Sequence, residues 1–74
     1  MSRLIRMDHT GHSTLAEWTT EDSVAFDAAA IAFRREIDEG YIGVVSQGEG
    51  HATQVQDLPP EADLVIMRRP IAGG

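Results

Sequence analysis

The eleven residues from Leu64 to Gly74 constrain the fold of this chain most strongly. They begin with four apolar residues, Leu64 to Met67, and continue through two arginines to Pro70. An apolar residue at every position is typical of a central strand with neighbours on both sides and a helix over one face. Because proline has no amide hydrogen and cannot donate to a sheet ladder, we expect this strand to end at about Arg69. The rest of the chain must supply the neighbouring strands and the helix.

The segment after this strand, residues 70–74, is expected to form a tail beyond a domain of residues 1–69. An extended chain from Met67 to Gly74 reaches roughly 23 Å, enough to enter a narrow cleft on another protein. Gly73 and Gly74 have no Cβ, which lets their backbone lie against a partner's surface. We therefore expect the Gly74 carboxylate to be the reactive group. The alternative is a frayed chain end, where small residues are common.

Length and composition exclude several functions. A chain of 74 residues is one domain, in which only about 60% of the unfolded surface is buried. The net charge of −6 argues against binding to nucleic acids or anionic membranes, because phosphate contacts need a basic surface. The absence of cysteine excludes disulfides, thiol nucleophiles and cysteine metal sites. No apolar run is long enough for a membrane span or a signal peptide, so we expect a cytoplasmic protein.

All six residues counted as lysine or arginine are arginines. Chance in an arginine-biased sequence explains this as well as function does. The functional interpretation is that a protein whose carboxylate becomes activated carries no lysine that could attack it.

The amino-terminal part is predicted to be a β-hairpin. Residues 3–8 alternate in the period of two that is typical of a half-buried strand. Residues 9–12 form the turn, in which Gly11 can take a positive φ. Residues 13–18, with β-branched and aromatic side chains at their ends, return as the second strand.

A helix is predicted from Val24 to Glu39. Residues 19–23 supply hydroxyls and carboxylates where the free N–H groups of the first turn need acceptors. Gly40 is suited to the left-handed conformation that ends many helices. Four apolar residues at helical spacing are expected on the buried face: Phe26, Ala30, Phe33 and Ile37. Three acidic residues crowd the last turn, against the helix dipole: Glu36, Asp38 and Glu39.

The second half of the chain adds three strands. Its segments are a strand (41–47), a turn (48–50), a polar edge strand (51–56), a proline-bearing crossover (57–62) and the closing strand. Two strands, one helix and three strands make an α+β plan with a helix over one sheet face. Successive strand residues point to opposite faces, so either Leu64 and Ile66 or Val65 and Met67 face away from the helix. Either pair leaves an apolar patch beside the tail, and we name Leu64 and Ile66 as the partner patch.

These elements resemble ubiquitin and its β-grasp relatives over nearly the whole chain. The resemblance includes the hairpin around Thr10-Gly11, the helix over 21–39, the crossover, and the final strand that runs into Gly73-Gly74. Arg68-Arg69 is similar to the arginine-bearing tail of ubiquitin-like modifiers. Residues 70–74, Pro-Ile-Ala-Gly-Gly, are similar to the tail of the sulfur carriers of molybdopterin, thiamine and cysteine synthesis. The chain departs from ubiquitin in lacking lysines for chain building, and the typical middle segment of the sulfur carriers is not found.

The resemblance implies a β-grasp fold of order ββαβββ with a mixed sheet, and a protein that is a substrate and not an enzyme, with no cofactor of its own. An activating enzyme of the ubiquitin/ThiF-like class would use ATP to adenylate Gly74. In a modifier, the acyl group passes to a cysteine of a conjugating enzyme and then to an amine of a target protein, and a deconjugating protease can reverse the step. In a carrier, the adenylate becomes a thiocarboxylate that donates sulfur. The activating enzyme is expected to recognise the tail through Arg68, Arg69, Pro70, Ile71, Ala72 and Gly73.

Two catalytic or metal-binding functions are weaker alternatives. His9, His12 and His51 could approach one another, but a turn does not fix imidazoles on one face and no carboxylate has suitable ligand spacing, so we predict no metal site. Ser13 beside His12 is sequence adjacency, not a positioned nucleophile and base.

A third alternative is a non-covalent β-grasp adaptor in which the glycines are incidental, since fold alone does not determine function. Between modifier and carrier we favour the modifier, because the guanidinium groups of Arg68 and Arg69 suit carboxylates on an activating enzyme.

Overall fold

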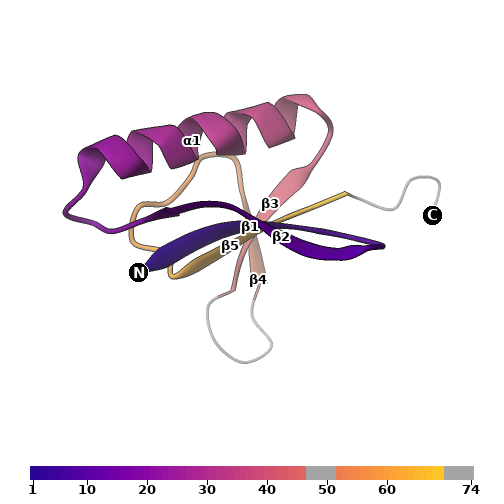
Figure 1. The fold of residues 1–74 in the computed structure, drawn as a ribbon. Helices are drawn as coiled ribbons and strands as arrows, with labels where there is room; N and C mark the ends of the chain where they lie inside the picture. Colours follow the sequence, from indigo (N-terminus) through magenta and orange to yellow (C-terminus); the bar gives the residue numbers. More distant parts are fainter. Residues whose placement is uncertain (47–51, 70–74) are drawn as a thin grey trace.

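A computed structural model describes residues 1–46 and 52–69, and in it one helix lies across one face of a five-stranded sheet (Figure 1). The elements are, in chain order, β1 (Ser2–Asp8), β2 (Gly11–Trp18), α1 (Ser23–Asp38), β3 (Ile42–Ser46), β4 (Ala52–Val55) and β5 (Leu64–Arg68). The α+β class and the predicted succession of strands and helix along the chain are confirmed. Within the described residues, no helix has the length and apolar character needed to cross a membrane.

The sheet is mixed, and the order of its strands in space, β2-β1-β5-β3-β4, differs from their order along the chain. β5 is central as predicted, parallel to β1 on one side and antiparallel to β3 on the other. The polar strand β4 lies at one edge, also as predicted. The end of β5, from which the tail continues, is therefore held by hydrogen-bonded neighbours on both sides.

The predicted hairpin is confirmed, with a tighter turn. Asp8 pairs with Gly11, which leaves His9 and Thr10 as the loop. Gly11 has a φ of 123°, which a residue with a Cβ rarely adopts. The Asp8 carboxylate accepts hydrogen bonds from the amide and the hydroxyl of Thr10 and so closes the turn.

The helix begins at Ser23 and ends at Asp38, one residue before each predicted limit. Asp22 is the N-cap, and its side chain accepts a hydrogen bond of 3.0 Å from the amide of Ala25. Gly40 has a φ of 98°, as expected of a glycine that ends a helix.

The buried helix face needs a correction. Its fully buried residues are Ala29, Phe33 and Glu36, whereas the predicted Phe26, Ala30 and Ile37 are half-buried at its margins. The prediction followed the apolar residues alone and placed Glu36 only as one of three acidic residues in the last turn. Its carboxylate lies inside because it pairs with Arg6 from the sheet.

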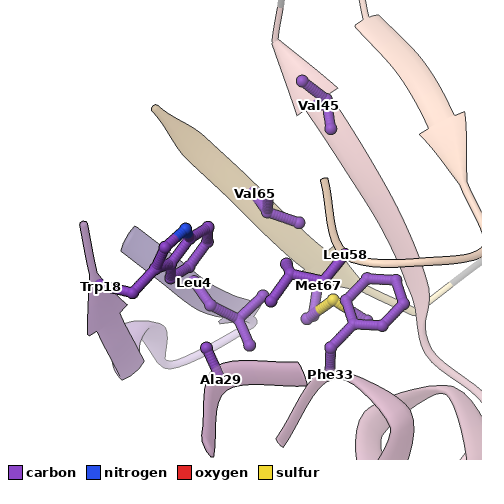
Figure 2. Close-up of a cluster of buried hydrophobic side chains, with 8 residues drawn as sticks. All are labelled: Leu4, Trp18, Ala29, Phe33, Val45, Leu58, Val65 and Met67. Carbon is purple, nitrogen blue, oxygen red and sulfur yellow. The ribbon is translucent and has the colours of Figure 1, made fainter. Parts of the chain in front are cut away.

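The core fills the space between α1 and the sheet, and Figure 2 shows its side chains. The members of this cluster are Leu4, Trp18, Ala29, Phe33, Val45, Leu58, Val65 and Met67. Leu58 comes from the crossover, so this segment closes the core as well as connecting strands. Trp18 fixes the crossover further, since its indole Nε1 donates a hydrogen bond of 3.0 Å to the carbonyl of Pro60. Its ring also meets Phe26 edge to face at 5.9 Å between centroids.

Candidate functional site at the end of strand β5

The alternation of side chains along β5 settles which residues face away from the helix. Val65 and Met67 are completely buried beneath α1. Leu64 and Ile66 are half-buried and point to the opposite face. The choice that the sequence left open is thus decided, and the predicted partner patch lies on the face without the helix.

This second face is apolar across three strands. Ile5 of β1 and Val44 of β3 both pair with Ile66, and Met7 and Ile42 both pair with Arg68, so their side chains share its face. We call it the open face, made of Ile5, Met7, Ile42, Val44, Leu64 and Ile66. Among the described residues, no helix lies over it (Figure 1). Met7 is 47% exposed, whereas Ile5 is only 7% exposed.

The same alternation separates the two arginines that precede the tail. Arg68 is exposed on the open face, next to Met7 and Ile42. Arg69 is directed to the helix side, where its guanidinium carbon lies 5.1 Å from the centroid of the Tyr41 ring. Its Nη2 also donates a hydrogen bond of 3.5 Å to the carbonyl of Glu39. The two arginines are adjacent in sequence and were predicted to act together in recognition, but their side chains have different surroundings.

A half-buried ion pair supports this end of the sheet. Arg6 Nη1 lies 3.3 Å from both carboxylate oxygens of Glu36, whose exposure is 6%. The guanidinium of Arg6 also lies over the Tyr41 ring, 5.7 Å from its centroid. Sequence reasoning missed the pair. The sequence did carry a signal for it: Arg6 lies two residues after Leu4 on the same strand, so its side chain points to the same face of the sheet as the buried Leu4.

A pocket of about 500 Å³ lies where β1 and β5 end, lined by Met7, Asp8, His9, Tyr41, Arg68 and Arg69. The hydrogen bonds from the Thr10 hydroxyl and amide lower the pKa of Asp8 below its usual value of 3.8. The Asp8 carboxylate therefore remains ionised near neutral pH and is already occupied by Thr10. The exposed guanidinium of Arg68 beside the apolar open face suits the binding of a partner that carries a carboxylate.

The structure bears on two of the alternatives, the Ser13–His12 pair and a metal centre, within the described part of the chain. Ser13 and His12 are successive residues of β2, so their side chains point to opposite faces. Within residues 1–46 and 52–69, no three histidine or carboxylate groups converge as metal ligands do. His51, the turn at 48–50 and the tail residues Pro70, Ile71, Ala72, Gly73 and Gly74 lie outside the described residues, and the predictions for them stay predictions.

No protein-family model, curated protein or solved structure matches this chain. Its function therefore has to be argued from its own residues and geometry.

Proposed function

We propose that this chain is a ubiquitin-like protein modifier with a β-grasp fold, whose Gly74 carboxylate is adenylated by an activating enzyme and joined to amines of target proteins. One helix packed on a mixed five-stranded sheet supports the fold assignment. The observation that carries the function is the place of β5. The strand that precedes Gly73-Gly74 is central and is paired on both sides, so the chain that leads to the terminal carboxylate starts from a rigid support.

The chemistry needs a partner enzyme. A carboxylate is inert to nucleophiles until one of its oxygens becomes a leaving group. In the proposed reaction, a Gly74 carboxylate oxygen attacks the α-phosphorus of ATP and pyrophosphate leaves, which forms an acyl adenylate. A cysteine thiolate of the partner then attacks the acyl carbon and AMP leaves, giving a thioester. Attack by a target amine forms the amide and releases the thiol.

The open face and Arg68 are the proposed docking elements for the partners. Leu64 and Ile66 lie on β5, the strand that leads to the tail, and Ile66 comes two residues before Arg68. A protein that binds this face and reaches Arg68 is therefore also placed near the tail. The exposed Arg68 sits at the border of this apolar area and forms no ion pair with any described residue. An activating enzyme with a carboxylate beside an apolar surface would fit both features. The proposed location is the cytoplasm, and ATP is bound by the partner.

A sulfur carrier is the second candidate, favoured by the Pro-Ile-Ala-Gly-Gly sequence of residues 70–74. The adenylated Gly74 would then accept sulfur and become a thiocarboxylate. Lack of lysine suits both functions, since either protein carries an activated acyl group.

Intact mass spectrometry of the protein from its native cells tests these proposals. A form that lacks Gly74 is compared with the wild type, and Asp27→Asn on the exposed side of α1 serves as a matched control. We expect amide-linked adducts through Gly74 in the wild type and in Asp27→Asn, and none in the deletion form. Exchange of one carboxyl oxygen for sulfur would identify a carrier instead. A free carboxylate throughout, with function retained after deletion, would identify a non-covalent module.

A further inference from the structure

We infer that Tyr41 is a positioning residue, which holds the side chain of Arg69 against the carboxyl end of α1 and so fixes the point from which the tail starts. The role in presenting Gly74 rests on the proposed function. The contact itself is a property of the folded chain and is tested separately below.

The contact follows from strand register. Ile42 pairs with Arg68, and the next positions outward are Tyr41 and Arg69, which therefore face each other on the helix side. The Arg69 guanidinium carbon lies 5.1 Å from the ring centroid, within the range of a cation–π interaction. The hydrogen bond from Arg69 to the carbonyl of Glu39 adds the negative end of the helix dipole as a second partner.

Tyr41 is a rigid support because the fold holds it from the other side. Its amide donates a hydrogen bond of 3.0 Å to the carbonyl of Glu36, and its ring packs against the core. Arg6 lies 5.7 Å from the same ring and is bound to the buried Glu36 carboxylate. The ring cannot follow Arg69 outward without disturbing these contacts. Arg69 is therefore ordered by the fold, whereas Arg68 stays available to a partner.

Because Arg69 is held by Tyr41 and Arg68 is free to contact a partner, loss of the Tyr41 contact and loss of Arg68 should have different consequences. Loss of Tyr41 should release Arg69 and widen the range of directions in which the tail begins, which slows any reaction that needs the tail in a narrow cleft. Loss of Arg68 should weaken partner binding and leave Arg69 in place. If Arg68 and Arg69 instead acted together in partner recognition, loss of either contact should weaken partner binding in the same way.

The contact is tested on the isolated protein by NMR. In the wild type, the Arg69 side-chain protons should be shifted upfield of those of Arg68 by the ring current of Tyr41. Tyr41→Leu should abolish the difference and Tyr41→Phe should keep it, while the indole N–H signal of Trp18 reports an intact core. If Tyr41→Leu does not fold, the spectra of the wild type and of Tyr41→Phe still test whether Arg69 lies against the aromatic ring. Equal Arg68 and Arg69 shifts in the wild type would refute the contact.

The positioning role is tested by the rate at which Gly74 is converted in native cells, followed by intact mass. Tyr41→Leu should be converted roughly two- to fivefold more slowly, the factor that matches a partly exposed cation–π contact. Tyr41→Phe should be near the wild type, and Arg68→Gln should slow conversion with no change in the Arg69 signals. Unchanged conversion in Tyr41→Leu overturns the positioning role. No conversion of the wild type overturns the proposed function, and the role with it, but leaves the NMR contact standing.

Discussion

The replacement Gly43→Ala tests how tightly the helix packs on the sheet. Gly43 lies in β3 opposite Met67, beneath the ring of Phe33. A Cβ built on Gly43 would lie 2.5 Å from Phe33 Cε2 and 2.9 Å from Cζ. Real Cβ atoms do not approach this closely, and Phe33 is held in the core at 2% exposure. The ring or the whole helix must therefore move to admit a single methyl group.

Two effects of opposite sign decide the outcome. Overpacking a core typically costs about 1–3 kcal/mol. Replacing a strand glycine by alanine returns about 0.5–1 kcal/mol in backbone entropy. We expect the clash to dominate, with a net loss of about 0.5–2 kcal/mol, out of a total of about 4–11 kcal/mol for a domain of 74 residues. For a domain of this size, Tm should fall by about 2–16 °C.

Thermal and urea unfolding, followed by circular dichroism, measure this change. The double variant Gly43→Ala with Phe33→Leu provides the control, because the smaller side chain makes room for the methyl group. The double variant should be at least about 0.5 kcal/mol more stable than the sum of the two single changes. A Gly43→Ala protein that is more stable than the wild type, with additive effects in the double variant, would refute the packing described here.

Two local contacts give further predictions. Asp22→Ala removes the helix N-cap that binds the amide of Ala25 and should lower the free energy of unfolding by about 0.5–2 kcal/mol. The neighbouring Glu21→Ala makes the same change of charge and should cost much less. Equal losses of stability in urea unfolding would contradict a capping role. In the hairpin, Thr10→Val should raise the pKa of Asp8 toward 3.8, as followed by carbon NMR of its carboxyl group. The pKa of Asp8 is lower in the folded state than in the unfolded state, so its stabilising contribution is present above pH 3.8 and is lost as the pH falls through the folded-state pKa. If Thr10→Val leaves the pKa of Asp8 unchanged, the hydrogen bond from the Thr10 hydroxyl is not the cause of the lowered pKa.

Several features were predictable from the sequence because their causes lie within a few residues. The hairpin turn needs a positive φ, which Gly11 supplies, and the helix needs a cap and a stop, which Asp22 and Gly40 supply. The uninterrupted apolar run of Leu64 to Met67 indicated a strand with neighbours on both sides, and β5 is central. These signals are local preferences of the backbone and of hydrophobic burial, so they are legible before any tertiary contact is known.

The candidate site depended on contacts that no local signal reports. The pairing of Arg6 with Glu36 joins residues 30 positions apart, and only the packing of α1 on the sheet brings a charged last-turn residue into the interior. Within the helix alone, Glu36 is in an unfavourable position, because its charge lies near the negative end of the helix dipole. The free-energy cost of burying the Glu36 carboxylate is offset by its ion pair with Arg6 of β1.

The sequence by itself determined the elements, their succession and the chemistry of the residues that follow β5. The tertiary structure decided which side of each strand is covered. From the sequence of β5 alone, either set of alternating residues could face the helix. The choice is made only when α1 and the paired strands bury Val65 and Met67 together. That choice turns Leu64, Ile66 and Arg68 outward and sends Arg69 to Tyr41, because adjacent side chains of a strand cannot share a face.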